Sequence, residues 1–498
     1  MATKPATLTP WATTLAAYPN SGLNNRVQPP VGWQTDGWDE NEEPAPNYEN
    51  YRAWEAYTWR VWFGAALARG ATKVVRSADS TDHHADYICD GVNDQVEIQA
   101  AIDAVAAMGT GGGMVLLSQG TFAINAALIL DTDVCIRGMG PGTVLQVEAT
   151  TAIDFNILRA TAKARVRVEN LLIDGNSAVA HGHFHTGVKL DNCSDAHVSN
   201  IVVINCDQSA VPTFGYGVHI AGGSLRTRIS QCEFTLVKGA GVYEEAAASM
   251  SLVANNILGL PGGGGGGWGG IIMNGARPLI VGNAVHSSFA IGIGVTADFA
   301  SILNNVIHDS GAHGIQAIGG SFCQIQGNRI YNSTRDGIQI GNDDSIVSGN
   351  LINAAGSQGI YVGAAERTII HENQIRATQT DGIYLDTCKS VSVKNNSIVD
   401  VSQALTNTSS GVYINGGAGC TVTGNRFRNS GATVSKASIE GVAGGSGAPA
   451  VYGNDCRAGS GTAEILDGAG DFVSVPVFAW DGAVHQTNTA AMDLVNII

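Results

Sequence analysis

Apolar positions recur with a fixed short period between Asn283 and Asn396. Each period of 22 or 23 residues contains an Asn, an apolar residue two places later, and a Gly-Ile pair whose Ile stands ten places later. The position three before the Asn is also apolar, as are most positions ten and twelve after it. This alternation predicts three short strands per period with every second side chain pointing inwards. The repeated asparagines are Asn305, Asn328, Asn350, Asn373 and Asn396.

The length of the period selects one architecture among the repeat folds. It is too short for a propeller blade, and the consensus of leucine-rich repeats is absent. The sequence therefore predicts an all-β fold, a right-handed parallel β-helix with three short strands in each 22–23-residue coil. We expect the repeated Asn to lie at a turn, to adopt the left-handed conformation, and to hydrogen-bond the Asn of the next coil.

A capping helix is expected before the strands. Asp94 and Glu97 fit a capping box at its start, and Gly109 ends it. Apolar residues three and four places apart form one helix face, namely Ile98, Ala101, Ile102, Val105 and Met108. Such a helix is suited to covering the open end of a stack of strands, where backbone groups would otherwise be unpaired.

Composition divides the chain into four segments. The first holds six of the eight Trp and a helix expected over residues 48–68, whose aromatic stripe packs either on its own domain or on a partner. The segments are 1–75 (particle attachment), 76–144 (entry and capping helix), 145–455 (parallel β-helix) and 456–498 (C-terminal cap or assembly element).

The overall composition narrows the classes of function. Of 498 residues, 64 are Gly and 14% are charged, and the formal net charge is −16. An acidic chain without a Lys/Arg run disfavours nucleic acid as a partner and, on average, an acidic polysaccharide. Neither a signal peptide nor an apolar run of membrane-spanning length is evident, so membrane insertion is not expected. Nine scattered Cys predict buried free thiols rather than a zinc site or disulfides, and no cofactor is expected.

Equivalent positions of successive coils stack about 4.8 Å apart, so the repeat predicts columns of side chains. Eight places after each Asn stand His313, Asp336, Gln358 and Asp381. Asp336 and Asp381 would lie two coils apart, about 10 Å, near the upper end for an inverting pair of carboxylates. The alternative is solvated turn residues, because Asp before Gly is ordinary turn chemistry.

A second column stands sixteen places after the Asn and holds Asp344, Glu366 and Lys389. Neighbouring carboxylates about 5 Å apart would suit a retaining pair. The same residues would equally form an exposed ladder in which the Lys balances the charge.

A third column, eleven places after the Asn, alternates with inward residues and is expected to face outwards. Its members are Gln316, Gln339, Tyr361 and Tyr384, and Tyr413 continues it after a six-residue insertion between Asn396 and Gly411. A row of Tyr and Gln on a flat sheet fits a sugar-binding face, a trimer interface or ordinary stacking between coils, and the sequence leaves the three open. Gln358 and Trp268, which follows a run of glycines, are further candidates for binding sugar.

Two smaller patterns lie in the irregular region before the repeat. His181, His183 and His185 alternate, as metal ligands on a strand would, but no second set of ligands is evident and a polar turn is favoured. Glu244 and Glu245 are weaker candidates for an acid.

Residues 89–102, with Gly120, Thr121 and Phe122, resemble the opening of pectate-lyase-like β-helix proteins, an opening common in bacteriophage tailspikes and related tail proteins. The Trp/Pro-rich head is similar in style to particle-attachment regions of phage tail proteins. Members of this group are usually homotrimers that bind, and often cleave, surface polysaccharides. The polygalacturonase pattern of an Asp pair with Gly-His-Gly is absent here, so that activity is not carried over.

The resemblance implies a virion or phage-tail-like particle, formed in the host cytoplasm, with other tail or baseplate proteins bound through residues 1–75. Three hypotheses for function stay open. The first is a tailspike or tail-fibre depolymerase, a hydrolase or lyase acting on host surface polysaccharide, with His313, Asp336, Asp381, Asp344 and Glu366 as candidate catalytic residues. The second is a non-enzymatic structural or receptor-binding spike. The third is a free-standing polysaccharide lyase or epimerase.

Overall fold

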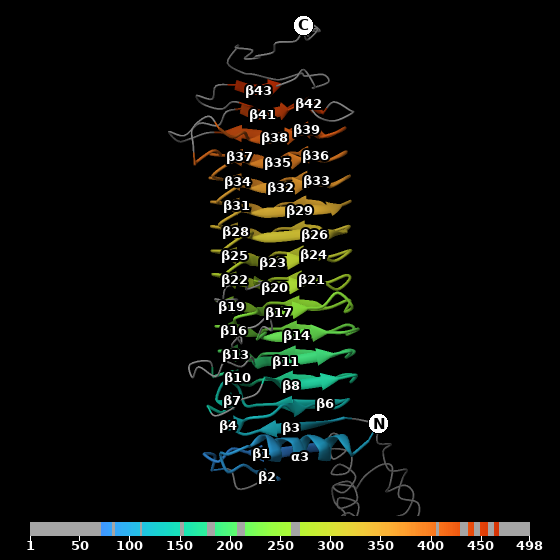
Figure 1. The fold of residues 1–498 in the computed structure, drawn as a ribbon, viewed down its shortest axis with the longest axis vertical. Helices are drawn as coiled ribbons and strands as arrows, with labels where there is room; N and C mark the ends of the chain where they lie inside the picture. Colours follow the sequence, from blue (N-terminus) through green and yellow to red (C-terminus); the bar gives the residue numbers. More distant parts are fainter. Residues whose placement is uncertain are drawn as a thin grey trace, which may run out of the picture.

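The computed structural model describes most of the chain between residues 71 and 467 (Figure 1). The described ranges are 71–81, 85–109, 112–149, 154–176, 185–206, 215–259, 269–404, 408–428, 437–442, 449–456 and 463–467. The helix expected over 48–68, nearly all of the attachment segment and most of the C-terminal segment lie outside these ranges.

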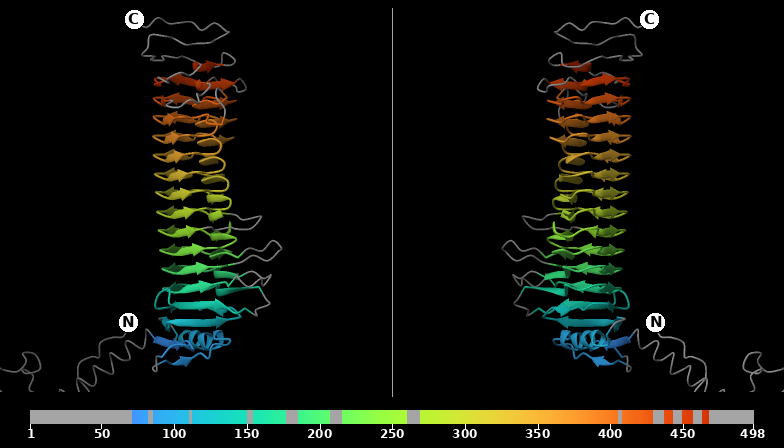
Figure 2. Two further views of the ribbon diagram at one scale, coloured as in Figure 1. Left: turned by 90° about the vertical axis from the view of Figure 1, so that its left-hand side faces the viewer. Right: turned by 90° about the vertical axis from the view of Figure 1, so that its right-hand side faces the viewer.

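Three parallel sheets run along the molecule, and each complete coil contributes a strand to each of them (Figure 1, Figure 2). Sheet A has 16 strands. In sheet order they are β2 (Tyr87–Ile88), β1 (Ala71–Arg76), β3 (Gly113–Leu117), β6 (Val134–Arg137), β9 (Arg167–Glu169), β12 (His197–Ser199), β15 (Arg228–Ser230), β18 (Leu252–Ala254), β21 (Leu279–Val281), β24 (Ser301–Leu303), β27 (Gln324–Gln326), β30 (Ile346–Ser348), β33 (Ile369–His371), β36 (Ser392–Lys394), β39 (Thr421–Thr423) and β42 (Ala450–Tyr452).

Sheet B has 13 strands and follows sheet A in each coil. They are β4 (Gly120–Ile124), β7 (Thr143–Val147), β10 (Leu172–Asp174), β13 (Val202–Ile204), β16 (Glu233–Thr235), β19 (Ile257–Gly259), β22 (Ala284–His286), β25 (Val306–His308), β28 (Arg329–Tyr331), β31 (Leu351–Asn353), β34 (Gln374–Arg376), β37 (Ser397–Val399) and β40 (Arg426–Arg428).

Sheet C has 14 strands and completes each coil. They are β5 (Leu128–Ile129), β8 (Phe155–Thr161), β11 (His185–Asp191), β14 (Val218–Ala221), β17 (Ala240–Glu244), β20 (Gly269–Met273), β23 (Ile291–Val295), β26 (Ile315–Ser321), β29 (Ile338–Asp343), β32 (Ile360–Gly363), β35 (Ile383–Asp386), β38 (Val412–Asn415), β41 (Ala437–Val442) and β43 (Ala463–Asp467). The predicted right-handed parallel β-helix is confirmed, and its first strand along the chain, β1, already pairs with β3 in sheet A although most of β1 falls in the segment 1–75.

The core is a single apolar column inside the three sheets. Along β29, Ile338 and Ile340 are fully buried, whereas Gln339 between them faces outwards and is half-buried. The small or apolar position five before each Asn is buried in every coil of the regular repeat, as Ala300 and Val391 illustrate. Period-two alternation therefore sorts each strand into an inner and an outer row.

The repeated asparagines form a continuous buried ladder. In Asn328, the backbone N–H and the side-chain NH2 both donate to Oδ1 of Asn350, at 2.9 and 3.0 Å. The same pattern links Asn256, Asn283, Asn305, Asn328, Asn350, Asn373, Asn396, Asn425 and Asn454. This confirms the predicted hydrogen bond between coils and satisfies buried polar groups at each turn.

The prediction that the ladder Asn adopts the left-handed conformation is wrong. Positive φ falls instead on the residue before it, for example Asn304 (54°), Gly327 (68°) and Asn395 (55°). The turn needs its left-handed residue one place earlier, so that the Asn that follows can direct its amide into the stack.

The Gly of each Gly-Ile pair permits close approach between coils. A Cβ on Gly337 would lie 2.7 Å from the carbonyl oxygen of Gly359 and 2.4 Å from Cγ2 of Ile352, both in the next coil. Neither distance is compatible with a side chain. The repeated Gly is therefore a packing requirement.

Helix α3 (Gln95–Ala106) lies across the first strands at one end of the stack (Figure 1). Four residues of its predicted apolar face are buried, namely Ile98, Ala101, Ile102 and Val105, but Met108 lies beyond the helix and is half exposed. The prediction of a capping box is wrong. The Asp94 carboxylate accepts hydrogen bonds from the backbone N–H of Gly91 and of Ala123, both at 2.8 Å, and its side chain does not cap the first turn of the helix. Among the described residues, no helix has the length and apolarity needed to span a membrane.

The nine cysteines are free thiols, as the sequence predicted. Eight are buried, and Cys135 is half-buried. Burial raises the pKa of the Cys232 and Cys323 thiols to about 12. Such thiols are protonated at neutral pH and pack as small apolar side chains.

Candidate functional site

The outer face of sheet C carries the predicted row of Gln and Tyr. Register pairing places Gln316 opposite Gln339, Gln339 opposite Tyr361, Tyr361 opposite Tyr384, and Tyr384 opposite Tyr413. All five side chains are half-buried. The predicted outward column is confirmed, and it continues across the six-residue insertion before Tyr413.

Side chains in this row interact directly with one another. The amide nitrogen of Gln316 donates to Oε1 of Gln339 at 2.5 Å. The rings of Tyr361 and Tyr384 stack with centroids 5.6 Å apart, and those of Tyr384 and Tyr413 with centroids 5.0 Å apart. The row therefore presents a flat aromatic strip whose edges carry hydrogen-bonding groups, the combination that sugar rings contact.

Asp386 and Asn415 form a second outward row beside the tyrosines. The Tyr361 hydroxyl donates to Oδ2 of Asp386 at 2.9 Å, and the Asn415 amide donates to Oδ1 of the same carboxylate at 2.9 Å. Burial, and then the neighbouring carboxylate of Asp386, raise the pKa of Tyr361 to about 12. The Tyr361 hydroxyl is therefore a hydrogen-bond donor throughout the physiological pH range.

Three of the four residues eight places after the Asn are buried, and Gln358 is half-buried. His313, Asp336 and Asp381 are 7%, 5% and 7% exposed, so the interpretation as solvated turn residues is wrong. Asp336 accepts from the backbone N–H of Gln358 at 3.2 Å, and Asp381 accepts from that of Ser410 at 2.6 Å. These carboxylates join successive coils at the start of the sheet C strands.

These buried carboxylates precede strands of sheet C, Asp336 two residues before β29 and Asp381 two residues before β35. Asp336 is among the charges that raise the pKa of Tyr361, and Asp381 is among those that raise the pKa of Tyr384, although burial is the main cause in both cases. Nδ1 of His313 lies 3.1 Å from Oδ2 of Asp336, without the alignment of a hydrogen bond. The structure thus brings two predicted columns together, and the catalytic role of the buried one stays a prediction.

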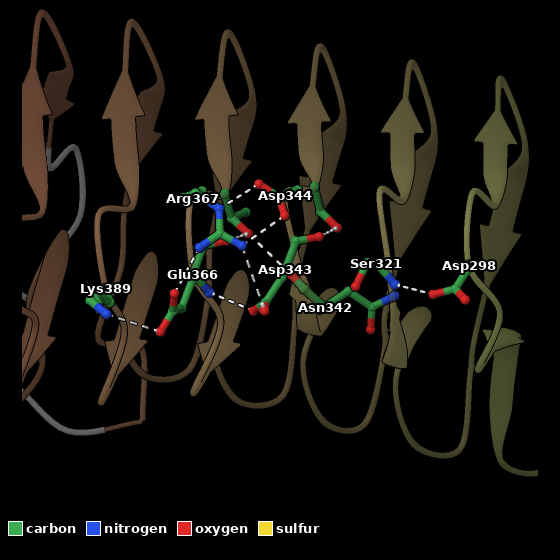
Figure 3. A network of polar contacts seen from close by, with 10 residues as sticks. Asp298, Ser321, Asn342, Asp343, Asp344, Glu366, Arg367 and Lys389 are labelled. Atoms are coloured by element: carbon green, nitrogen blue, oxygen red, sulfur yellow. Dashed lines mark hydrogen bonds and ion pairs between the residues drawn. The ribbon is translucent and has the colours of Figure 1, made fainter.

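The column sixteen places after the Asn has a different register from the one predicted (Figure 3). Asp344 is equivalent to Arg367, since both hold the left-handed turn position, at φ 53° and 54°. Glu366 instead pairs with Lys389. The spacing between ladder asparagines grows from 22 to 23 residues at this coil, and the extra residue precedes the turn.

Arg367, which the sequence reasoning missed, organises this turn. Its guanidinium binds both oxygens of Asp344, at 2.6 and 2.8 Å, and Oε2 of Glu366 at 2.8 Å (Figure 3). Lys389 adds a contact of 3.4 Å to Glu366. The guanidinium therefore stands between the two carboxylates of the predicted retaining pair. The geometry is that of the exposed charged ladder, and the catalytic role of Asp344 and Glu366 stays a prediction.

Three side chains near α3 could offer metal ligands. Ligand atoms of Cys89, Asp94 and Glu97 lie within 4.8 Å of one another, the one such group in the part of the chain that the structure describes. Both Asp94 oxygens already accept backbone N–H groups, and burial raises the pKa of the Cys89 thiol. A metal ligand would require a thiolate and free carboxylate oxygens, so this group is structural.

Several candidates from the sequence do not join the site. Trp268, His181 and His183 lie outside the described residues. His185 is buried and packs edge-on against Phe155, with ring centroids 4.9 Å apart. Gln358 lies on the turn before β32, where its neighbour Ser357 donates to its side-chain oxygen at 2.5 Å.

Comparison with known proteins agrees with this architecture. Residues 291–456 match the family described as the right handed beta helix region. No curated protein matches the sequence. Among solved structures, a tailspike protein double mutant of E. coli bacteriophage HK620 covers 82% of this chain and 81% of its own length, with a TM-score of 0.53 and 12% identity.

Two further solved structures are similar over comparable spans. A mannuronic acid specific polysaccharide family 6 lyase from human gut microbiota covers 76% of this chain and 91% of its own, with a TM-score of 0.50 and 14% identity. The pre-mature bacteriophage phi29 gene product 12 covers 80% of this chain and 56% of its own, with a TM-score of 0.50 and 12% identity. At such identities likeness establishes the fold alone. The chain folds as a right-handed parallel β-helix, and residues 291–456 match the family model of that fold.

Proposed function

We propose that this protein is a phage-type spike that binds a surface polysaccharide along the outer face of sheet C. The observation that carries the proposal is the strip formed by Tyr361, Tyr384 and Tyr413, whose rings stack over three successive coils. Half-buried tyrosines provide large contact areas at a low cost in conformational entropy, and their hydroxyls bind sugar hydroxyls.

The groups around the strip suit a chain of sugars. Gln316 and Gln339 extend it towards the N-terminal coils, and Asp386 and Asn415 flank it. Such side chains offer both donors and acceptors, which a glycan with many hydroxyls requires. Equivalent positions repeat about every 4.8 Å, so a polymer aligned with the helix axis meets similar groups in each coil.

Binding of purified bacterial surface polysaccharides by the full chain tests this proposal. We expect Tyr384→Ala to weaken the affinity for a bound polysaccharide at least about tenfold, as removal of a central aromatic anchor does. The matched control is Tyr331→Ala, because Tyr331 is an outward, half-buried tyrosine of sheet B that stacks on His308 at 4.5 Å. Equal losses in the two variants, or none in Tyr384→Ala, would contradict the proposal.

Cleavage of the polysaccharide is the second candidate function. The close approach of His313 to Asp336, just before the neighbouring sheet C strands β26 and β29, favours it over a purely structural spike. New reducing ends or unsaturated products on incubation with a bound polysaccharide, lost in Asp336→Asn, would support it. The same proposal includes assembly as a homotrimer and attachment to a particle through residues 1–75. Light scattering on the full chain measures the number of subunits.

A further inference from the structure

A second cluster of polar and aromatic side chains lies on sheet C, before the regular repeat begins. His219 in β14 stands directly opposite Tyr243 in β17. Both belong to the outward row that continues to Gln316. Tyr216 stacks on Tyr243 with ring centroids 4.7 Å apart, and the His219 ring lies 4.9 Å from Tyr216 and 5.3 Å from Tyr243.

Glu245 orients the imidazole of His219. Its Oε1 lies 3.0 Å from Nε2 of His219, and its Oε2 accepts from the backbone N–H of Gly222 at 2.8 Å. A carboxylate only accepts, so Nε2 carries the hydrogen and Nδ1 carries the lone pair of the neutral ring. Nδ1 has no protein partner among the described residues, and it is not one of their buried atoms.

The surrounding groups keep this imidazole neutral. Burial, followed by the positive charge of Lys189, lowers the pKa of His219, and the charges of Glu245 and Asp191 oppose this only in part. Lys189 pairs with His219 in the neighbouring strand β11, so its ammonium group lies on the same face about one coil away. The cluster therefore combines a neutral base, a carboxylate that positions it, and a nearby cation.

We propose that His219 is the general base of a hydrolytic site that removes ester-linked acyl groups from a glycan. The inference rests on the proposed function, because the glycan on sheet C would supply the ester. Nδ1 takes a proton from water while the water oxygen bonds to the acyl carbon. The oxyanion that forms lies near the ammonium group of Lys189. The acyl C–O bond then breaks, and the imidazolium returns its proton to the sugar oxygen, which releases a carboxylic acid and a sugar hydroxyl.

The arrangement favours ester cleavage over cleavage of a glycosidic bond. Glycosidases use two accessible carboxyl groups across the scissile bond. Here Glu245 is engaged by His219 and Gly222, and Glu244 points to the other side of the strand, where it is fully buried. A neutral imidazole positioned by a carboxylate is instead the usual means of activating water or a hydroxyl.

The test measures acetate release by the full chain from 4-nitrophenyl acetate and from O-acetylated bacterial polysaccharides. We expect His219→Ala to lower kcat/KM about 100-fold, within the range of general-base catalysis. The rate should rise with pH through a midpoint below 6.5, because the pKa of His219 is lowered from that value. Glu245→Gln should lower kcat with little effect on KM and should move the midpoint further down, since Glu245 raises the pKa of His219.

His371→Ala is the matched control, because His371 is an outward histidine of sheet A beside its own glutamate, Glu372, 3.7 Å away. A wild-type rate in His219→Ala on both substrates, or an equal loss in His371→Ala, would overturn the inference. Binding of the polysaccharide with its esters left intact would also overturn it, while leaving the proposed function standing. Absence of any polysaccharide binding would instead count against the proposed function.

Discussion

Tyr361 donates its phenolic hydrogen to Asp386 of the next coil, with the two oxygens 2.9 Å apart. The same carboxylate accepts from Asn415 one coil further on, so Asp386 connects β32, β35 and β38 on the outer face of sheet C. A bond network that spans three coils holds the aromatic strip in one conformation before any ligand arrives, and such pre-organisation favours affinity.

Removal of this link should weaken binding without unfolding the protein. We expect Asp386→Ala to reduce polysaccharide affinity about threefold to tenfold, less than Tyr384→Ala, because the rings remain but lose their fixed orientation. It should also lower the pKa of Tyr361, which Asp386 helps to raise, in an ultraviolet pH titration. Asp309→Ala is the control, since Asp309 accepts from Asn332 at 3.0 Å in a comparable bond between coils away from sheet C. Loss of affinity in the control would contradict this prediction.

Asn350→Ala should be strongly destabilising. Oδ1 of Asn350 accepts two bonds from Asn328, and its amide donates to Ile325 and Asn373, all in the buried interior. Truncation leaves those groups unsatisfied, so we expect a loss of about 3 kcal/mol in the free energy of unfolding. The midpoint of urea unfolding measures it.

Asn353→Ala is the matched control for the ladder variant. Asn353 is the outward residue of β31, three places after Asn350, and is half-buried. We expect a change within about 0.5 kcal/mol, typical of surface sites. Comparable losses in both variants would show that the ladder has no special role in stability.

Gly337→Ala should destabilise the protein by about 3 kcal/mol, because a Cβ there meets a backbone carbonyl that cannot move aside. Gly259→Ala provides the comparison. The nearest atom to its added Cβ is Oγ1 of Thr235 at 3.9 Å, which is ordinary contact. Thermal unfolding of the two variants should separate them clearly, and equal unfolding temperatures would refute the packing argument.

Glu244 should make stability depend on pH. Burial raises its pKa from 4.5 to about 7, and the hydroxyl of Ser251 donates to its Oε1. Between these values the folded state binds a proton that the unfolded state has lost, so stability falls as pH rises from about 4.5 to 7 and is then constant. This difference in pKa between the unfolded and folded states corresponds to about 3 kcal/mol of stability.

Glu244→Gln tests this linkage, since the amide has the same shape and does not titrate. Urea unfolding between pH 4.5 and 8 should show a flatter profile than in the wild type. Glu233→Gln, at an exposed position of β16, should retain the wild-type slope. An unchanged slope in Glu244→Gln would mean that this carboxyl is not the group responsible.

Arg367→Ala should cost less than about 1 kcal/mol, although Arg367 forms several charged hydrogen bonds. Its side chain is 52% exposed and that of Glu366 is 36% exposed, so water and salt compete with the ion pairs. Denaturant midpoints at low and high salt check this. A loss above about 2 kcal/mol would mean that this turn is a structural anchor.

Much of the fold could be predicted because the repeat is regular. The apolar positions around Asn328 and Asn350 identified the inward-facing rows. Counting eleven places from each Asn identified the row from Gln316 to Tyr384, which Tyr413 continues after the insertion. The same counting failed at Asp344, because one extra residue before the turn changes which side chains are neighbours. Counting residues from the Asn therefore predicts which side chains are neighbours within a strand, but fails across a turn of variable length.

The cluster around His219 could not be found by counting. Tyr216 and Tyr243 are stacked, yet the coils that hold them do not keep the 22–23-residue period. Glu245 was visible only as one of two adjacent acids, and the sequence does not show that one faces outwards to His219 while the other is buried. Glu244 is the last residue of β17 and Glu245 follows it, so which of the two faces outwards depends on where the strand begins and ends.

The Asn ladder tolerates coils of unequal length. Consecutive members are separated by 22, 23, 27 or 29 residues, yet their hydrogen bonds stay between 2.9 and 3.0 Å. The hydrogen-bonded stack of coils therefore does not depend on the length of the turns that connect its strands. Residues can be inserted or deleted in a turn without disturbing the coils on either side. A protein of this kind can acquire a new recognition loop in a single step, because its stability is held by contacts that the loop does not enter.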